Sequence, residues 1–86
     1  MLAAMTISPD DIRALIRAAL PDAEVSLHDL TGTADHWKAR IVSASFAGRS
    51  PIERHRLINR ALATELAGPI HALTMELLTP EEASAP

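Results

Sequence analysis

Two serine-proline pairs constrain the fold of this chain more than any other feature, because each marks the start of a helix. Ser8-Pro9 precedes two acids that complement a helix dipole, and Ser50-Pro51 precedes Glu53. Serine caps free backbone amides, and an acid three residues later completes a capping box. We therefore expect one helix from Ser8-Pro9 to about Leu20 and a second from Pro51.

The segments between and after these helices predict three strands. Residues 23–30 and 36–44 alternate between apolar and polar, and residues 31–35 form a turn that makes them a hairpin. Gly68-Pro69 ends the helical region, and residues 70–78 predict the third strand. A final helical turn is expected from Thr79-Pro80.

An arginine interrupts the apolar stripe of the second helix. The stripe is formed by Leu57, Ile58, Ala61, Leu62 and Leu66. In a straight helix Arg54 would lie in the middle of this face, so we expect a bend or break near Asn59 and a helix-turn-helix shape. The order predicts an α+β fold: a three-stranded mixed sheet with helices on one face and a right-handed crossover to a parallel third strand.

Length and composition narrow the functional classes. The 86 residues fit a single domain, residues 1–86, with a core of about residues 8–80. The chain has no cysteine, so any metal must bind through histidine or carboxylates. The first residues resemble neither a signal peptide nor a membrane span, so we expect a cytoplasmic protein with no membrane partner. No nucleophile motif or phosphate-binding glycine loop is present, so we do not expect an enzyme.

Charge is segregated along the chain. Residues 1–37 carry a net charge of −4, residues 38–60 carry +5 and the remainder carries −4, which gives the total of −3. A basic middle segment favours an anionic partner: nucleic acid, an acidic protein face or a small carboxylate. An ordinary solvated surface is the alternative.

Several short motifs resemble those of the BolA family, more closely its short, IbaG-like bacterial branch. The resemblance extends from Ser8 to Pro80 and rests on Gly32 with His36-Trp37, Ile41-Val42-Ser43, Phe46-Ala47-Gly48, Ser50 with Arg54-His55-Arg56, Ile70-His71-Ala72-Leu73 and Thr79-Pro80. It implies a class II KH-like αββααβ topology, which agrees with the order read from the residues.

The resemblance also implies a partner and a cofactor. BolA-like proteins share a bridging [2Fe-2S] cluster with monothiol glutaredoxins, whose cysteine and bound glutathione supply thiolates, and the family's histidine ligand corresponds to His71. Some members add a second ligand from the hairpin loop, where this chain has Thr33-Ala34, so the nearest imidazole, His36, is our candidate. One or two histidines cannot hold a cluster alone, so we expect that the isolated chain binds no cluster tightly. The alternative role of His71 is structural, with one ring nitrogen hydrogen-bonded to the backbone and no metal bound. The alternative for His36 is that it is merely a polar residue of the turn.

Four arginines are candidates for gripping glutathione carboxylates or an acidic glutaredoxin face: Arg49, Arg54, Arg56 and Arg60. The alternative is surface solubility with local pairs such as Arg56 with Glu53. We expect His55 to have a structural role near the bend, and His28 to be exposed without a specific role.

The leading hypothesis is a non-catalytic adaptor in iron-sulfur cluster trafficking or iron sensing that works as a heterodimer with a monothiol glutaredoxin. The alternative is a helix-turn-helix or KH-like nucleic-acid-binding transcriptional regulator. Against it, the chain is acidic and lacks the Gly-x-x-Gly loop of KH domains. A third reading is an interaction module with incidental histidines. The isolated protein is expected to be a monomer or a weak homodimer.

Overall fold

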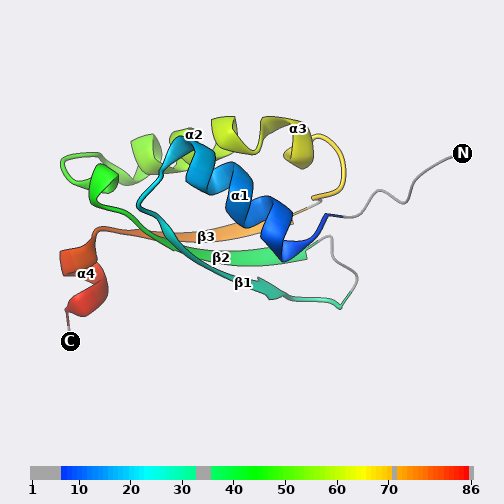
Figure 1. Cartoon of the computed structure of the whole chain (residues 1–86), viewed down its shortest axis with the longest axis horizontal. Coiled ribbons are helices and arrows are strands. Elements are labelled where there is room, and N and C mark those ends of the chain that lie inside the picture. Colours follow the sequence, from blue (N-terminus) through cyan, green and yellow to red (C-terminus); the bar gives the residue numbers. More distant parts are fainter. Residues whose placement is uncertain (1–6, 33–35, 71, 86) are drawn as a thin grey trace, which may run out of the picture.

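A three-stranded sheet carries its main helices on one face (Figure 1). The computed structural model describes residues 7–32, 36–70 and 72–85. Its elements are α1 (Pro9–Ala19), β1 (Glu24–Asp29), β2 (His36–Val42), the 3₁₀ turn η1 (Ala44–Phe46), α2 (Pro51–Ala61), α3 (Ala63–Leu66), β3 (Ala72–Leu78) and α4 (Pro80–Ser84). The predicted αββααβ order is therefore confirmed, with α4 where a last helical turn was expected.

The sheet is mixed, as predicted, with β2 in its centre. The strand order is β1-β2-β3, β1 runs antiparallel to β2, and β3 runs parallel to it. Val25 pairs with Ile41, and Trp37 pairs with Leu73. Because side chains alternate along a strand, this register puts the apolar residues on the face beneath the helices.

Capping boxes fix the starts of the helices. The Ser8 hydroxyl accepts a hydrogen bond from the Asp11 amide at 3.1 Å, and the Ser50 hydroxyl accepts one from the Glu53 amide at 3.2 Å. Thr79 forms the same motif at the start of α4. Each cap satisfies amides that have no partner inside the helix, so both predicted starts are confirmed.

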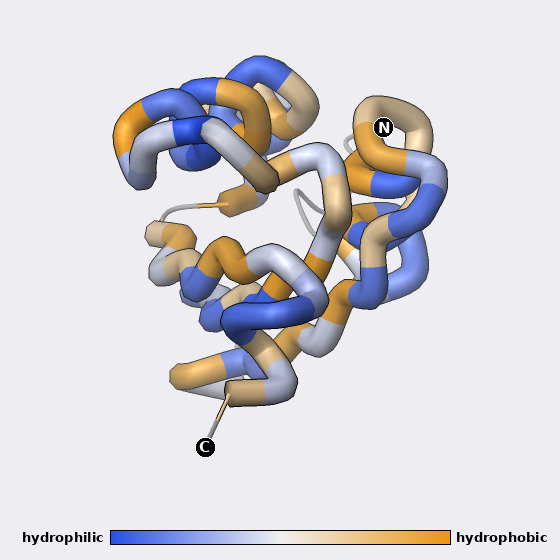
Figure 2. The backbone as a smooth tube through the Cα atoms, turned by 90° about the vertical axis from the view of Figure 1, so that its left-hand side faces the viewer, coloured by the Kyte–Doolittle hydropathy of each residue, from blue (hydrophilic) through white to orange (hydrophobic). Residues whose placement is uncertain are grey.

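The core lies between the helices and the sheet. Its fully buried side chains include Ile12, Ile16, Ile41, Phe46, Ile58 and Leu62. Figure 2 shows apolar stretches alternating with hydrophilic ones along helices and strands, the pattern that burial of one face requires. Burying one such large apolar side chain stabilises the fold by about 1.5–3 kcal/mol.

The predicted break in the second helical segment occurs, three residues after Asn59: α2 ends at Ala61 and α3 begins at Ala63. The reason given for it is wrong, because intramolecular partners accommodate Arg54 and α2 is regular around it. Strand β2 ends at Val42 rather than at residue 44 as predicted, because the chain then turns into η1.

Two arginines of α1 bond to backbone carbonyls beyond the helix. The Nε of Arg13 donates to the Val25 carbonyl at 3.3 Å and that of Arg17 to the Ala23 carbonyl at 3.1 Å. These bonds tie α1 to β1 and its approach. They also occupy carbonyls at the sheet edge, which discourages pairing with a foreign strand.

Among the described helices, none is long and apolar enough to cross a membrane.

Candidate functional site

One predicted metal ligand, His36, lies at the end of the sheet where β2 and β3 begin. Strand β2 begins at His36 and β3 begins at Ala72, and these two residues are Cα partners in the parallel pairing. His71 lies outside the described residues. Its neighbours are described: the Ile70 side chain is buried, and Ala72 is exposed. His36 is half-buried. The ligand roles of His36 and His71 remain predictions.

The donor chemistry of the chain fits a shared cluster better than a resident one. Among the described residues, no group of three or more His, Cys, Asp or Glu side chains is arranged to hold a metal ion. The sequence offers four histidines and no cysteine, whereas a [2Fe-2S] cluster takes four ligands, usually thiolates. Imidazoles of this chain suit one side of such a cluster, provided that another molecule supplies the sulfur ligands.

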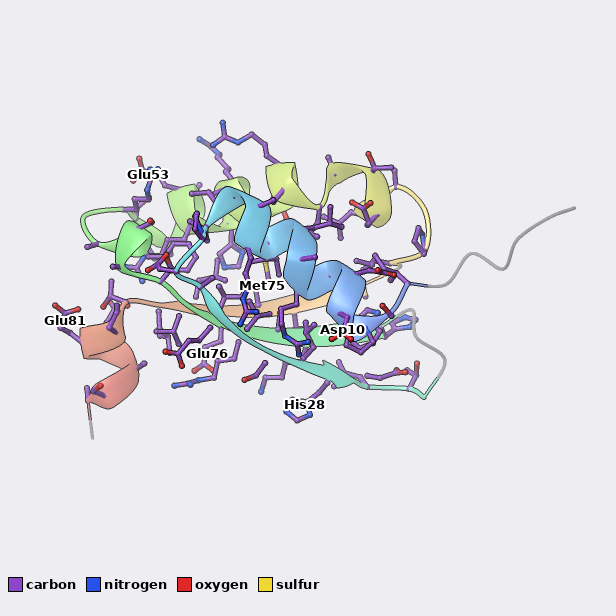
Figure 3. The ribbon with its side chains drawn as sticks, in the orientation of Figure 1. Asp10, His28, Glu53, Met75, Glu76 and Glu81 are labelled. Atoms are coloured by element: carbon purple, nitrogen blue, oxygen red, sulfur yellow. The ribbon has the colours of Figure 1, made fainter. Side chains whose placement is uncertain are left out.

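The other two histidines lie away from this end. His28 is exposed on β1, opposite Lys38, and points away from the helices (Figure 3). The prediction that His28 is exposed is confirmed. His55 is exposed on α2, and the break between α2 and α3 comes at Leu62, about two turns further along the chain.

Three of the four candidate arginines gather on the solvent side of α2. Arg49, Arg56 and Arg60 line a shallow hollow of about 530 Å³, together with Glu53, Asn59 and Ala63. Arg56 and Arg60 are one helical turn apart, which places them on the same side. Figure 3 shows Glu53 at the start of α2, pointing away from the sheet.

Arg54 is separate from this group. Its side chain is 12% exposed, and its NH1 atom lies 2.7 Å from Glu82 Oε1 and donates to the Leu77 carbonyl at 3.0 Å. Its Nε donates to the Arg49 carbonyl at 3.1 Å, and its guanidinium carbon lies 5.7 Å from the centre of the Phe46 ring. This arginine therefore joins α2 to β3 and α4, and its guanidinium is occupied by the fold.

Glu53 places one ionised carboxylate among these arginines. Hydrogen bonds from Ser50 hold the pKa of Glu53 below its usual range, and the charges of Arg49 and Arg56 lower it further. Its carboxylate accepts the Ser50 amide at 2.8 Å. The predicted Arg56–Glu53 ion pair is absent among the described residues, because the cap uses that carboxylate.

Comparison with known proteins gives the family. The family model "BolA-like protein" matches residues 18–82, which is most of the chain. This chain belongs to the BolA family. A BolA-like protein from Babesia bovis superposes with a TM-score of 0.79 at 34% identity, covering 94% of this chain and 93% of that structure. The predicted resemblance and fold are thus confirmed.

Two BolA relatives bear on function and length. BolA-like protein 2 of Mus musculus is 39% identical over 80 residues, which cover 91% of this chain and 92% of the relative. The "DNA-binding transcriptional regulator BolA" of Vibrio cholerae is 45% identical over 60 residues, which cover 69% of this chain and 57% of the relative. The chain spans only 37% of BolA-like protein 1 from Pongo abelii and 57% of the one from Mus musculus.

The structure of this BolA domain shows an exposed apolar residue on α2 that was not predicted from the sequence. Ile52 is 63% exposed, and with Pro51, His55, Arg56 and Asn59 it lines a second hollow of about 390 Å³. The signal was present in the sequence. Ile52 lies six positions before the buried Ile58, about 120° away around a helix, so it falls outside the apolar stripe.

Proposed function

We propose that this BolA-family protein is a non-catalytic, cytoplasmic adaptor that shares a [2Fe-2S] cluster with a monothiol glutaredoxin. His71 is the proposed main ligand and His36 the second. The observation that carries this proposal is the pairing of His36 with Ala72, since His36 begins β2 beside the residue that follows His71 in the chain. Neighbouring strands lie about 4.8 Å apart, so His36 lies close to the start of β3.

The chemistry of imidazole supports the assignment. A bound cluster would supply one-electron and iron-transfer chemistry. The residues of this chain determine how it is held: neutral imidazole in place of thiolate leaves the cluster less negative and raises its potential. The missing thiolates would come from the glutaredoxin cysteine and glutathione. Of the four arginines expected to grip these partners, Arg54 is engaged within the fold, and Arg49, Arg56 and Arg60 lie together on the solvent side of α2. The proposal for cluster sharing therefore rests on the histidines and does not include these arginines.

The test is reconstitution with histidine variants. The protein is mixed with a monothiol glutaredoxin, iron, sulfide and glutathione, and visible absorption and circular dichroism are recorded. The mixture should give a spectrum that glutaredoxin alone does not give. His71→Ala should abolish it, and His36→Ala should shift it. The matched control is His28→Ala, an exposed imidazole on the open sheet face, which should leave it unchanged. An unaltered spectrum with His71→Ala would refute the proposal.

Nucleic-acid binding is the second candidate, and two observations favour it. Arg56 and Arg60 lie on the same solvent-facing side of α2, and the Vibrio cholerae relative is named a DNA-binding regulator. If α2 contacts phosphates, affinity for DNA should fall with salt, and Arg56→Ala should reduce the salt slope by about one. His71→Ala should have no effect on this binding. Affinity independent of Arg56 would exclude α2 as the contact.

A further inference from the structure

The solvent side of α2 is a continuous surface that cluster sharing does not use. The hollow lined by the arginines and the hollow lined by Ile52 share Arg56 and Asn59, so they adjoin. We call this surface the α2 face and define it by Arg49, Ile52, His55, Arg56, Asn59 and Arg60. It combines an exposed apolar side chain with clustered positive charge.

Ile52 is held in a fixed exposed position. It is 63% exposed, and among large apolar residues in the described part of the chain only Leu30, at 56%, is comparable. It lies in the first turn of α2, where the Ser50–Glu53 capping box fixes the helix. Because the helix directs Ile58 into the core, Ile52 cannot turn inward, and a partner would meet a preorganised apolar anchor.

The charge around Ile52 indicates the chemistry of the partner. In the described part of the chain, Arg56 and Arg60 have no carboxylate at ion-pair distance. Arg49 uses its Nε on the Ser45 carbonyl at 3.0 Å. Glu53 lines the same hollow and is ionised, so it offsets one of the three arginine charges and leaves a net charge of +2. The α2 face is therefore a positive patch on an acidic protein, and it attracts acidic groups.

An apolar anchor beside arginines is typical of a protein interface. Buried apolar contacts with a charged rim, in which arginine is enriched, are the usual anatomy of such interfaces. A nucleic-acid backbone offers no large apolar group to cover Ile52, and the face has no Phe, Tyr or Trp side chain on which a base could stack. The surface chemistry thus favours a protein segment over a nucleic acid.

The geometry points to a second docking site: the α2 face binds an acidic protein segment that places an apolar side chain against Ile52. Helix α2 begins near the end of the sheet where β2 and β3 finish, opposite the end where they start (Figure 1). Each of these strands has seven residues, so the two ends lie about 20 Å apart. The segment can therefore bind at the Ile52 end while a partner occupies the histidine end.

A synthetic peptide tests this site. The probe is a fluorescent peptide in which glutamates flank two leucines, and its binding is followed by fluorescence anisotropy. Ile52→Ser should weaken binding about tenfold, because the apolar contact is lost. Arg56→Ala should weaken it several-fold, and this effect should shrink at high salt. The matched controls are Leu30→Ser, the other exposed large apolar residue, and Lys38→Ala, an exposed cation on the sheet, and both should bind as the wild type does.

Several results would overturn the site. One is a peptide with serines in place of leucines that binds equally well, or an Ile52→Ser variant with unchanged affinity. Another is short duplex DNA that outcompetes the peptide regardless of Ile52. Self-association of the wild type that Ile52→Ser abolishes would make a second copy the occupant.

Two cross-controls separate this site from the proposed cluster sharing. The α2 variants should keep the spectrum formed with glutaredoxin, and His71→Ala should keep peptide binding. The docking site and the cluster ligands can therefore be refuted independently.

Discussion

Replacing Arg54 with alanine should destabilise the fold by about 3 kcal/mol, far more than replacing any arginine of the α2 face. The guanidinium joins parts of the chain that are distant in sequence. It donates to the Leu77 carbonyl on β3, pairs with Glu82 on α4, and lies over the Phe46 ring. With alanine, the Leu77 carbonyl loses its donor and α4 loses its link to α2.

The magnitude follows from the separate contacts. A hydrogen bond from a charged donor to the partly buried Leu77 carbonyl stabilises by about 1.5–3 kcal/mol. The pair with Glu82 contributes only about 0–1 kcal/mol, because the Glu82 side chain is 46% exposed and solvent screens the attraction. The contact with the Phe46 ring adds about 0.5–1 kcal/mol. The backbone bond is therefore the largest contribution.

Urea denaturation followed by circular dichroism measures the effect. Arg54→Ala should lower the free energy of unfolding by about 3 kcal/mol, and the matched control Arg56→Ala, on the solvent side of the same helix, should change it by less than about 0.5 kcal/mol. Arg54→Lys should fall between them, because an ammonium cannot reproduce the fork of a guanidinium. If Arg54→Ala costs no more than Arg56→Ala, the assignment of Arg54 to the fold is wrong.

Two further substitutions test local chemistry. The Asp22 carboxylate accepts from the Ser43 hydroxyl at 2.7 Å and the Ala44 amide at 2.8 Å, and these bonds hold the pKa of Asp22 below its usual range. A lowered pKa stabilises the fold above the unfolded value of about 4, and this contribution is lost as pH falls through the folded pKa. In melts at a series of pH values, the stability advantage of the wild type over Asp22→Asn should narrow below about pH 4, and a constant gap would contradict this. Gly48 has a φ of +76°, and a Cβ at this position would meet open space. Gly48→Ala should therefore lower the free energy of unfolding by about 1 kcal/mol through backbone strain alone. Urea denaturation measures this change, and an unchanged midpoint would exclude strain.

Features set by neighbouring residues were predictable from the sequence. The starts of α1 and α2 depend on a serine, a proline and acids within four positions, and the cap forms wherever those residues meet. The buried face of β2 likewise follows from its alternation. Trp37 and Ile41 are buried, while Lys38 and Arg40 are exposed.

Features set by distant residues were not predictable in this way. The bend at Asn59 was inferred from local spacing, on the premise that an arginine cannot occupy an apolar stripe. Glu82 lies 28 positions after Arg54, and only the folded arrangement of β3 and α4 brings them together. Arg13 is a similar case, because its Val25 partner depends on how α1 packs against β1.

The basic middle segment shows why counting charges along a chain overstates what a partner meets. Arg54 and Arg56 are two positions apart, which is about 200° around a helix, so they face opposite sides. Arg54 is neutralised by Glu82 and Arg40 by Glu76, both of which lie later in the chain. In the described part of the chain, the cations of this segment without an ion pair are Lys38, Arg49, Arg56 and Arg60. All but Lys38 belong to the α2 face. The positive charge that extends over the middle third of the sequence is therefore concentrated in the fold on one side of one helix, beside Ile52.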